Sequence, residues 1–320
     1  MTDNIEQIKG TSLWKDAWRR LLKNKLAVFG MIVLGIMALL VILGPIVLVW
    51  TTGMTADSIP ESGDLIKSFP PSLQHPMGTD EAGRDILARV LQGGRISLMV
   101  GVISTVVSLI VGVSYGAIAG YLGGRVDNIM MRIVDIIYSI PYILIVIVLL
   151  SVFGGQNTPR WIQFLSETFG GAGNQGLSQI FLLFFALGLV SWLTMARVVR
   201  GQILSLKNQE FVLAARATGV STPAIIFRHL VPNALGPVIV YATLTVPSVM
   251  LTEAFLSYLG LGVQAPFASW GSLASDGIKN IAIFPWQLLF PGLTMALTLF
   301  SLNFLGDGLR DALDPQTRKF

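Results

Sequence analysis

Few residues of this chain could carry out chemistry on a bound molecule. Its 320 residues include no cysteine and only two histidines, His75 and His229, which excludes disulfides, thiolate metal sites and a zinc site built from histidines alone. Neither the G-x-x-x-x-G-K-[ST] phosphate loop nor the G-x-S-x-G turn of a serine nucleophile occurs. The two histidines also lie on opposite sides of the membrane in the topology derived below. We therefore expect no enzyme, no metal and no cofactor bound by this chain.

Ionisable residues are also absent from most of the long apolar runs. Only Asp135, at one end of the third run, and Glu253, near one end of the fifth, fall inside them. A proton-coupled carrier usually keeps an ionisable group within the membrane as a relay. If this protein moves a solute uphill, its energy must therefore come from another component.

The composition indicates an integral membrane protein. The chain is 53% hydrophobic and 12% charged, with a mean hydropathy of +0.69, whereas soluble domains carry about a quarter charged residues. The net charge of +4 does not indicate a nucleic-acid partner, because basic residues in such chains mostly set topology. Six runs are long enough to cross a bilayer: Leu26–Trp50, Ile96–Tyr121, Ile133–Phe153, Ser178–Ala196, Ala234–Phe255 and Leu288–Gly306.

The basic residues predict that both termini and the segment between the fourth and fifth runs face the cytoplasm. Lys and Arg gather at the cytoplasmic side of membrane proteins. Six Lys and Arg residues lie before the first run, five lie in residues 197–233 and three lie after the last run. The loops after the third and fifth runs carry only one each. The first run, at about 25 residues, is too long for a cleavable signal peptide.

Residues Ser12 to Lys25 predict an amphipathic helix at the membrane interface. Trp14, Trp18, Leu21 and Leu22 recur at helical spacing, and cations occupy the other faces. The alternative is a partly ordered basic tail.

Small residues and prolines mark the runs that pack closely or bend. Pro141 predicts a kink or a break, and Pro247 and Pro291 predict kinks, which a translocation bundle tolerates better than a rigid anchor. A strip of small residues in the second run lets another helix backbone approach closely: Ser104, Ser108, Gly112, Gly116 and Gly120.

Charged residues outside the runs suggest local pairs and caps. Thr79 or Asp80 could cap a helix that begins near Glu81, and Arg84 could pair with Asp85. Arg132 and Asp135 are spaced to pair on one helix face. This acidic loop lacks the spacing of an EF-hand, so we do not expect calcium there.

The polar segment from Glu210 to Asn233 reads as helix, turn, helix between two apolar runs. Residues 211–218 are good helix formers, and Gly219 is placed as a C-terminal cap with positive φ. Ser221 or Thr222 could cap the next helix, with Pro223 in its first turn, and Pro232 would bend the chain into the fifth run. The residues alone do not separate a docking surface for a cytosolic partner from an ordinary connector.

This segment resembles the EAA loop of bacterial ABC-importer permeases, through Ala214, Ala215, Gly219 and Pro232. Leu213 stands where that family usually has glutamate, and Glu210 supplies an acid three residues earlier. Further motifs, including HPMGTDEAGRD, GYLGGRVDNIMMR, SWLTMARVVRGQ and GDGLRDALDP, resemble the C-type permease subunit of oligopeptide and dipeptide importers over nearly the whole chain.

The resemblance implies an all-α fold with six transmembrane helices and several partners. These are a homologous B-type permease, two cytosolic ATPases that bind the ATP and Mg, and a periplasmic peptide-binding protein. The implied coupling residues are Glu210, Phe211, Ala214, Ala215, Arg216, Gly219 and Pro232. The implied division is a tail at 1–25, the first helix at 26–50, a periplasmic loop at 51–95, a core at 96–306 with its coupling loop at 205–233, and a tail at 307–320.

Two questions stay open at this point. Glu253 either lines the outer vestibule, where it would meet a peptide's N-terminus, or is a solvated interfacial residue; with Pro247 it is the candidate for the translocation path. The substrate is an oligopeptide by the nearest resemblance, while related importers carry dipeptides, nickel chelates, glutathione or murein peptides.

Two other classes of protein compete with an importer subunit: an autonomous secondary carrier and a membrane scaffold that transports nothing. A Gly-rich insertion at 153–176 has no interpretation from sequence.

Overall fold

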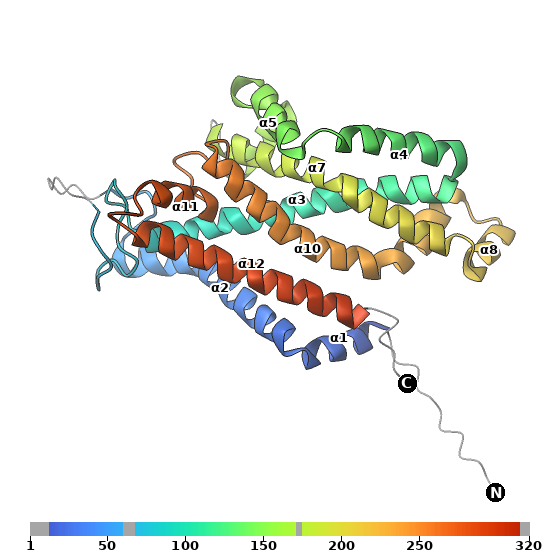
Figure 1. Ribbon diagram of the computed structural model, residues 1–320, viewed down its shortest axis with the longest axis horizontal. Helices are drawn as coiled ribbons and strands as arrows, with labels where there is room; N and C mark the ends of the chain where they lie inside the picture. The colour runs from blue at the N-terminus through green and yellow to red at the C-terminus, as the bar shows by residue number, and fades with distance from the viewer. Residues whose placement is uncertain (1–12, 60–67, 171–174, 314–320) are drawn as a thin grey trace, which may run out of the picture.

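The computed structural model describes residues 13–59, 68–170 and 175–313, and it is a bundle of helices (Figure 1). The sequence expectations for Ser12, for the Trp14 side chain and for the cations at 9, 318 and 319 lie outside what it describes. The elements are α1 (Leu13–Lys23), α2 (Lys25–Thr52), α3 (Ile86–Leu122), α4 (Gly124–Tyr138), α5 (Tyr142–Phe153), η1 (Gly155–Asn157), α6 (Arg160–Gly170), α7 (Gln175–Leu206), α8 (Glu210–Ala217), α9 (Thr222–Ala224), η2 (Ile225–Leu230), α10 (Val231–Tyr258), α11 (Trp270–Lys279) and α12 (Trp286–Leu313).

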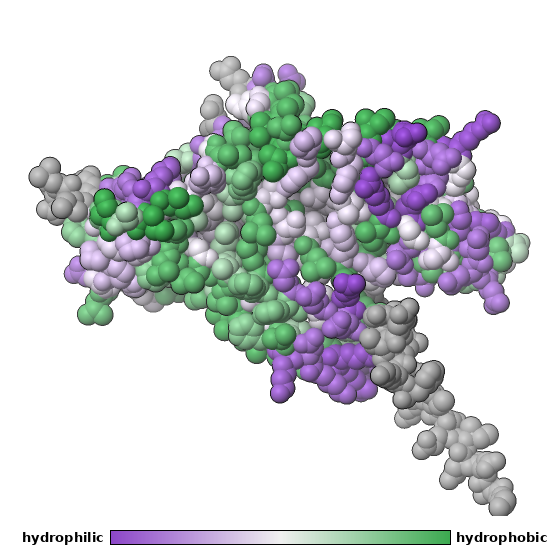
Figure 2. Space-filling view, in the orientation of Figure 1, coloured by the Kyte–Doolittle hydropathy of each residue, from purple (hydrophilic) through white to green (hydrophobic). Residues whose placement is uncertain are grey.

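Five helices in the described residues are long and apolar enough to cross a membrane, or six if the bent pair α4 and α5 is counted as one span. The predicted runs all fall on these helices, but several were too short, and two of them by about ten residues at one end. Helix α3 begins at Ile86 rather than near Ile96, and α7 continues to Leu206 rather than ending near Ala196. Both extensions carry arginines, which a search for apolar runs rejects. Figure 2 shows hydrophobic surface across the middle of the bundle and hydrophilic surface around α1 and α8.

The third apolar run is broken rather than continuous. Helix α4 ends at Tyr138 and α5 starts at Tyr142, with an angle of 84° between them. Pro141 lacks an N–H and has an extended ψ of 118° at the start of α5, so the helix cannot run through it. The break predicted at Pro141 is confirmed, and it turns α5 away from the line of α4 (Figure 1).

The strip of small residues on α3 faces α7. All five of its members are buried, and Ser104 donates a hydrogen bond to the Phe184 carbonyl at 2.8 Å. A methyl group added at Gly112 would lie 2.6 Å from the Met195 Cβ, and one added at Gly120 would lie 3.0 Å from the Arg200 carbonyl oxygen. The two backbones therefore approach as closely as glycine allows.

The fifth span begins further back in the sequence than expected. Residues Thr222–Tyr258 form one continuous helix, whose stretch from Ile225 to Leu230 is π-helical. Pro232 lies in the first turn of α10, inside this helix rather than before it. A wider π turn just before a proline relieves the clash between its ring and the preceding carbonyls.

The loop between α2 and α3 pairs its charges differently from the expectation. Helix α3 is capped by Asp85, which accepts a hydrogen bond from the Ala88 N–H at 2.8 Å, so no helix begins near 81. Asp80 instead binds Arg84 and Arg89 at 2.8 and 2.6 Å, and Asp85 binds His75 at 2.8 Å. Asx-type turns at Asp80 compete with helix formation, which is why the helix starts five residues later.

The N-terminal helix lies against the last one. Ala17 and Leu21 of α1 pack with Ala27 and Ala312, whereas Trp18 and Leu22 are half exposed. The helix is amphipathic as predicted, but its apolar side is divided between α12 and the outer surface. The exposed part is available to a lipid interface.

Gly116 provides a direct test of the contact between α3 and α7. A methyl group added there would press on the Ala196 carbonyl oxygen and the Arg200 backbone nitrogen, which cannot move independently. We expect Gly116→Ala to destabilise the bundle by about 1–3 kcal/mol, the usual cost of overpacking. The control is Gly35→Ala on α2, which meets nothing within 4 Å. Thermal melting of the detergent-purified protein should separate the two, and equal melting temperatures would contradict the close contact.

Candidate functional site

Helix α8 is a short, well-terminated helix at one end of the bundle (Figure 1). Gly219 has a φ of 78°, and the Val220 N–H donates to the Ala215 carbonyl at 3.1 Å. This six-to-one bond after a left-handed residue is the Schellman motif, which requires glycine or asparagine at the turn. The helix and its glycine cap are confirmed, and Ser221 caps α9 without a side-chain hydrogen bond.

One face of α8 is anchored in the bundle. Val212 and Ala215 are buried in a cluster that includes Ile203 and Ile225, and the guanidinium of Arg216 lies 5.0 Å from the ring centre of Tyr121. Ala215 is 7% exposed, so it contacts this chain's own core. Ala215, one of the implied coupling residues, therefore packs inside this chain, and a coupling role for it stays a prediction.

The opposite face of α8 is free for a partner within the described residues. Glu210, Leu213, Ala214 and Ala217 are exposed and fall at helical spacing on one side. Phe211 is half-buried beside them. Leu213, the residue that replaces the motif's usual glutamate, sits in the middle of this face with half of its surface exposed. A partner would meet an apolar residue there rather than a carboxylate.

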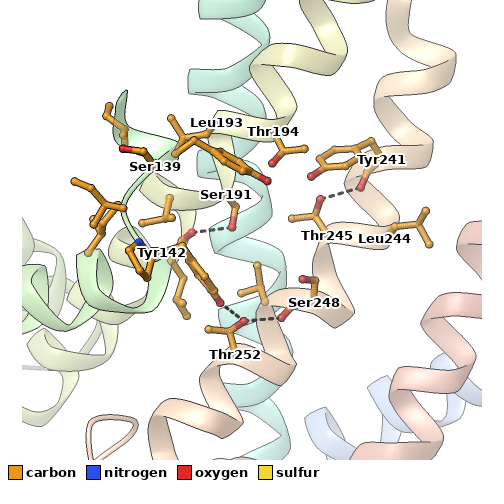
Figure 3. A pocket seen from close by; sticks show the side chains of 18 residues that line it. Ser139, Tyr142, Ser191, Leu193, Thr194, Tyr241, Leu244, Thr245, Ser248 and Thr252 are labelled. Carbon is orange, nitrogen blue, oxygen red and sulfur yellow. Dashed lines mark hydrogen bonds between the residues drawn. The ribbon is translucent and has the colours of Figure 1, made fainter. Parts of the chain in front are cut away.

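A groove of about 690 Å³ lies between the break of α4 and α5, helix α7 and helix α10. Figure 3 shows Tyr142 reaching from the start of α5 toward Thr252 on α10, and its hydroxyl donates a hydrogen bond to the Thr252 hydroxyl. The residues that line the groove include no Asp, Glu, Lys, Arg or His. Hydroxyl groups supply most of its polarity: Tyr138, Ser139, Tyr142, Ser191, Thr194, Tyr241, Thr245, Ser248 and Thr252.

Neither residue that the sequence analysis placed on the translocation path lines this groove. Glu253 is 1% exposed and accepts hydrogen bonds from Ser257 and Ser269, both at 2.7 Å. Pro247 is also buried. Glu253 is therefore neither a vestibule residue nor a solvated one, because it joins α10 to the start of α11 from inside the fold.

Two ion pairs fasten α4 to α7 near the end that carries α8. Asp127 binds Arg200 through both oxygens at 2.5 and 2.6 Å, and Asp135 binds Arg197 at 2.8 Å. The pairing expected between Asp135 and Arg132 is replaced by this contact between helices. Bidentate geometry fixes orientation as well as distance.

Arg95 on α3 was missed from sequence because it was expected to lie outside the second span. It donates to the Val41 and Ile42 carbonyls of α2 at 2.8 and 2.6 Å. Pro45 lies inside α2 and, four residues after Val41, cannot supply the N–H that this carbonyl would normally accept. A proline in one span and an arginine in another are the signal that could have identified the contact.

The described residues contain no group of three His, Cys, Asp or Glu side chains placed to hold a metal ion. Apolar spans, a charge-free groove and an exposed short helix at one end are features found in membrane transport subunits.

The chain belongs to the family of binding-protein-dependent transport system inner membrane components, whose model matches residues 112–319. A second model, the N-terminal TM domain of oligopeptide transport permease C, matches residues 12–60. The family expected from the EAA loop and the other motifs is thus shown.

Curated relatives match almost end to end. The chain is 49% identical over 312 residues to the oligopeptide transport system permease protein OppC of Escherichia coli K12, covering 98% of this chain and 94% of that protein. It is 44% identical over 311 residues to OppC of Bacillus subtilis, with 97% and 92% covered. It is 43% identical over 309 residues to the dipeptide transport system permease DppC of B. subtilis, with 96% and 87% covered.

A solved structure titled as inward facing conformations of the MetNI methionine ABC transporter is 19% identical. Its TM-score is 0.49, and the match covers 72% of this chain and 98% of that one. This likeness is too weak to add to the evidence of the relatives.

The contact between Arg95 and α2 predicts a rescue experiment. Arg95→Leu leaves the Val41 carbonyl without a donor, and we expect a loss of about 1–3 kcal/mol in stability. Pro45→Ala restores a backbone N–H to that carbonyl and should recover part of the loss in the double variant, while Pro45→Ala alone should change little. Thermal melting measures all three variants. Simple additivity of the two substitutions would show that Arg95 does not serve the carbonyl freed by Pro45.

Proposed function

We propose that this chain is one permease subunit of an ATP-driven importer that carries oligopeptides inward across the bacterial inner membrane. The observation that carries the proposal is the near-complete match, at 44–49% identity, to relatives named as oligopeptide permeases. The dipeptide permease at 43% identity supports dipeptides as a second candidate substrate. A charge-free groove agrees with a passage that must release what it carries.

The proposed topology has six spans, with both termini and α8 on the cytoplasmic side. The asymmetry of Lys and Arg along the chain supports this orientation, and α1 and α8 lie on hydrophilic surface in Figure 2. The sixth span is the bent pair α4 and α5. The proposed division places the periplasmic loop between α2 and α3, at residues 53–85 rather than 51–95, and keeps the coupling loop at 205–233 within the transport core.

Energy enters, in this proposal, through α8. Two cytosolic ATPases bind ATP and Mg, and one of them receives the exposed face of α8, which is formed by Glu210, Leu213, Ala214 and Ala217. Ala215, Arg216 and Gly219 hold α8 on the bundle, so that a push on the exposed face reaches α7 and α10. Closure of the ATPases then exchanges inward-open and outward-open states, a rigid-body transition.

The other partners are a homologous B-type permease and a periplasmic peptide-binding protein. The groove between the break at Pro141, α7 and α10 is open in this chain, and a second permease facing it would complete a passage. The periplasmic protein would dock at the opposite end of the bundle from α8, where α11 lies (Figure 1).

Reconstitution tests the transport function directly. The chain, its second permease, the ATPases and the binding protein are placed in liposomes, and uptake of tri-alanine and di-alanine is measured. We expect tri-alanine uptake that requires ATP and the binding protein. Uptake by this chain alone, driven by a proton gradient, would identify a secondary carrier and contradict the proposal.

Substitutions of two neighbouring alanines of α8 should have different effects on stability and on ATPase binding. Ala214 is exposed and Ala215 is buried. Ala214→Arg should keep the melting temperature of the permease pair but prevent co-purification of the ATPases. Ala215→Arg forces a charge into an apolar cluster and should lower the melting temperature itself. ATPases that stay bound to the Ala214→Arg protein would contradict docking on the exposed face.

A further inference from the structure

Four of the hydroxyl groups that line the groove share one hydrogen-bonding state. Ser139, Ser191, Thr245 and Thr252 each donate their proton to a backbone carbonyl three or four residues earlier in their own helix or turn, at 2.7–2.9 Å. A hydroxyl has one proton to donate and two lone pairs that accept. These four side chains therefore present acceptors, and not donors, to the groove.

A wall of hydroxyl acceptors favours ligands that carry hydrogen-bond donors. Backbone N–H groups and a terminal ammonium are donors, so an acceptor wall binds them without regard to the side chains of the ligand. No carboxylate lines the groove, so the donors are held by neutral hydrogen bonds, which contribute only about 0.5–1.5 kcal/mol each. Such a wall binds a polypeptide backbone weakly enough to release it.

The Thr252 hydroxyl already accepts one hydrogen bond. The Tyr142 hydroxyl donates to the Thr252 hydroxyl, which joins the first residue of α5 to α10 across the groove (Figure 3). Tyr142 directly follows Pro141 at the 84° bend, so its position depends on the angle between α4 and α5. One of the two lone pairs of Thr252 is thus used, and a ligand N–H that approaches this oxygen competes with the tyrosine for access to it.

We propose that Thr252, with Ser191 and Thr245, accepts hydrogen bonds from the backbone N–H groups of a passing peptide, and that Tyr142 closes the groove by occupying Thr252. The proposal rests on the peptide import proposed above and deepens it by assigning residues to the passage. The alternative occupant of the groove is a helix of the second permease. The hydroxyl acceptors favour the peptide, because a helix has satisfied its own N–H groups apart from those of its first turn.

The two partners of the Tyr142–Thr252 contact should behave oppositely when each loses its hydroxyl. In the assembled transporter, Thr252→Val removes the acceptor and should slow tri-alanine uptake about fivefold, the factor that corresponds to one neutral hydrogen bond. Tyr142→Phe removes only the competitor and should leave uptake equal or faster. The rate of each variant relative to wild type is then compared for tri-alanine and for its backbone N-methylated analogue, which lacks the amide N–H donors and keeps the terminal ammonium. The binding protein is the same in all assays, so its own preference cancels.

The expected result is a loss for Thr252→Val with tri-alanine and no loss with the N-methylated peptide. Thr298→Val is the matched control, because Thr298 also donates to its own helix at 2.9 Å but lies on α12 outside the groove. Equal losses from Thr252→Val and Tyr142→Phe, with both peptides, would show a merely structural link and overturn the proposal. So would unchanged uptake by Thr252→Val, or release of the second permease from that variant during gel filtration. A wild-type transporter that hydrolyses ATP but takes up neither peptide would instead sink the proposed peptide import, and this inference with it.

Discussion

The contact between α3 and α7 is the constraint on which the rest of the structure depends. Apolar helices in lipid gain little from hiding apolar surface, so close backbone packing and hydrogen bonds must hold them together. Gly112, Gly116 and Gly120 permit that approach, and Ser104 adds a bond across it. Helix α7 is thereby fixed while it contributes one wall of the groove, holds α4 through two arginines, and leads directly into α8.

Three charged side chains of the long helices each join one helix to another element. Arg95 joins α3 to α2, Glu253 joins α10 to α11, and Arg200 joins α7 to α4. Charges in a membrane are costly unless they are paired, and here the described pairs lie outside the groove lining. The passage is left with hydroxyl groups alone, which suits a path that should not hold its substrate tightly.

Local signals allowed much of this structure to be predicted, and long-range contacts account for the rest. The helix cap at Gly219 could be predicted because a left-handed turn depends on a single residue. The helix break at Pro141 could be predicted because a missing N–H interrupts a helix wherever it stands. The burial of Ala215 could not be predicted from the sequence, because it depends on the cluster around Ile203 and Ile225. Glu253 was misplaced for a similar reason: its partners include Ser269, sixteen residues away on another element.

The measurement that most directly tests a passage driven from α8 is the accessibility of the groove from each side of the membrane. The chain has no cysteine, so Ser248→Cys places one thiol on the groove lining. A membrane-impermeant thiol reagent, read out by mass spectrometry of this subunit, should label it from the cytoplasmic side at rest and from the outer side when the ATPases are trapped closed with vanadate. Labelling that does not change sides with the nucleotide state would contradict the alternating passage.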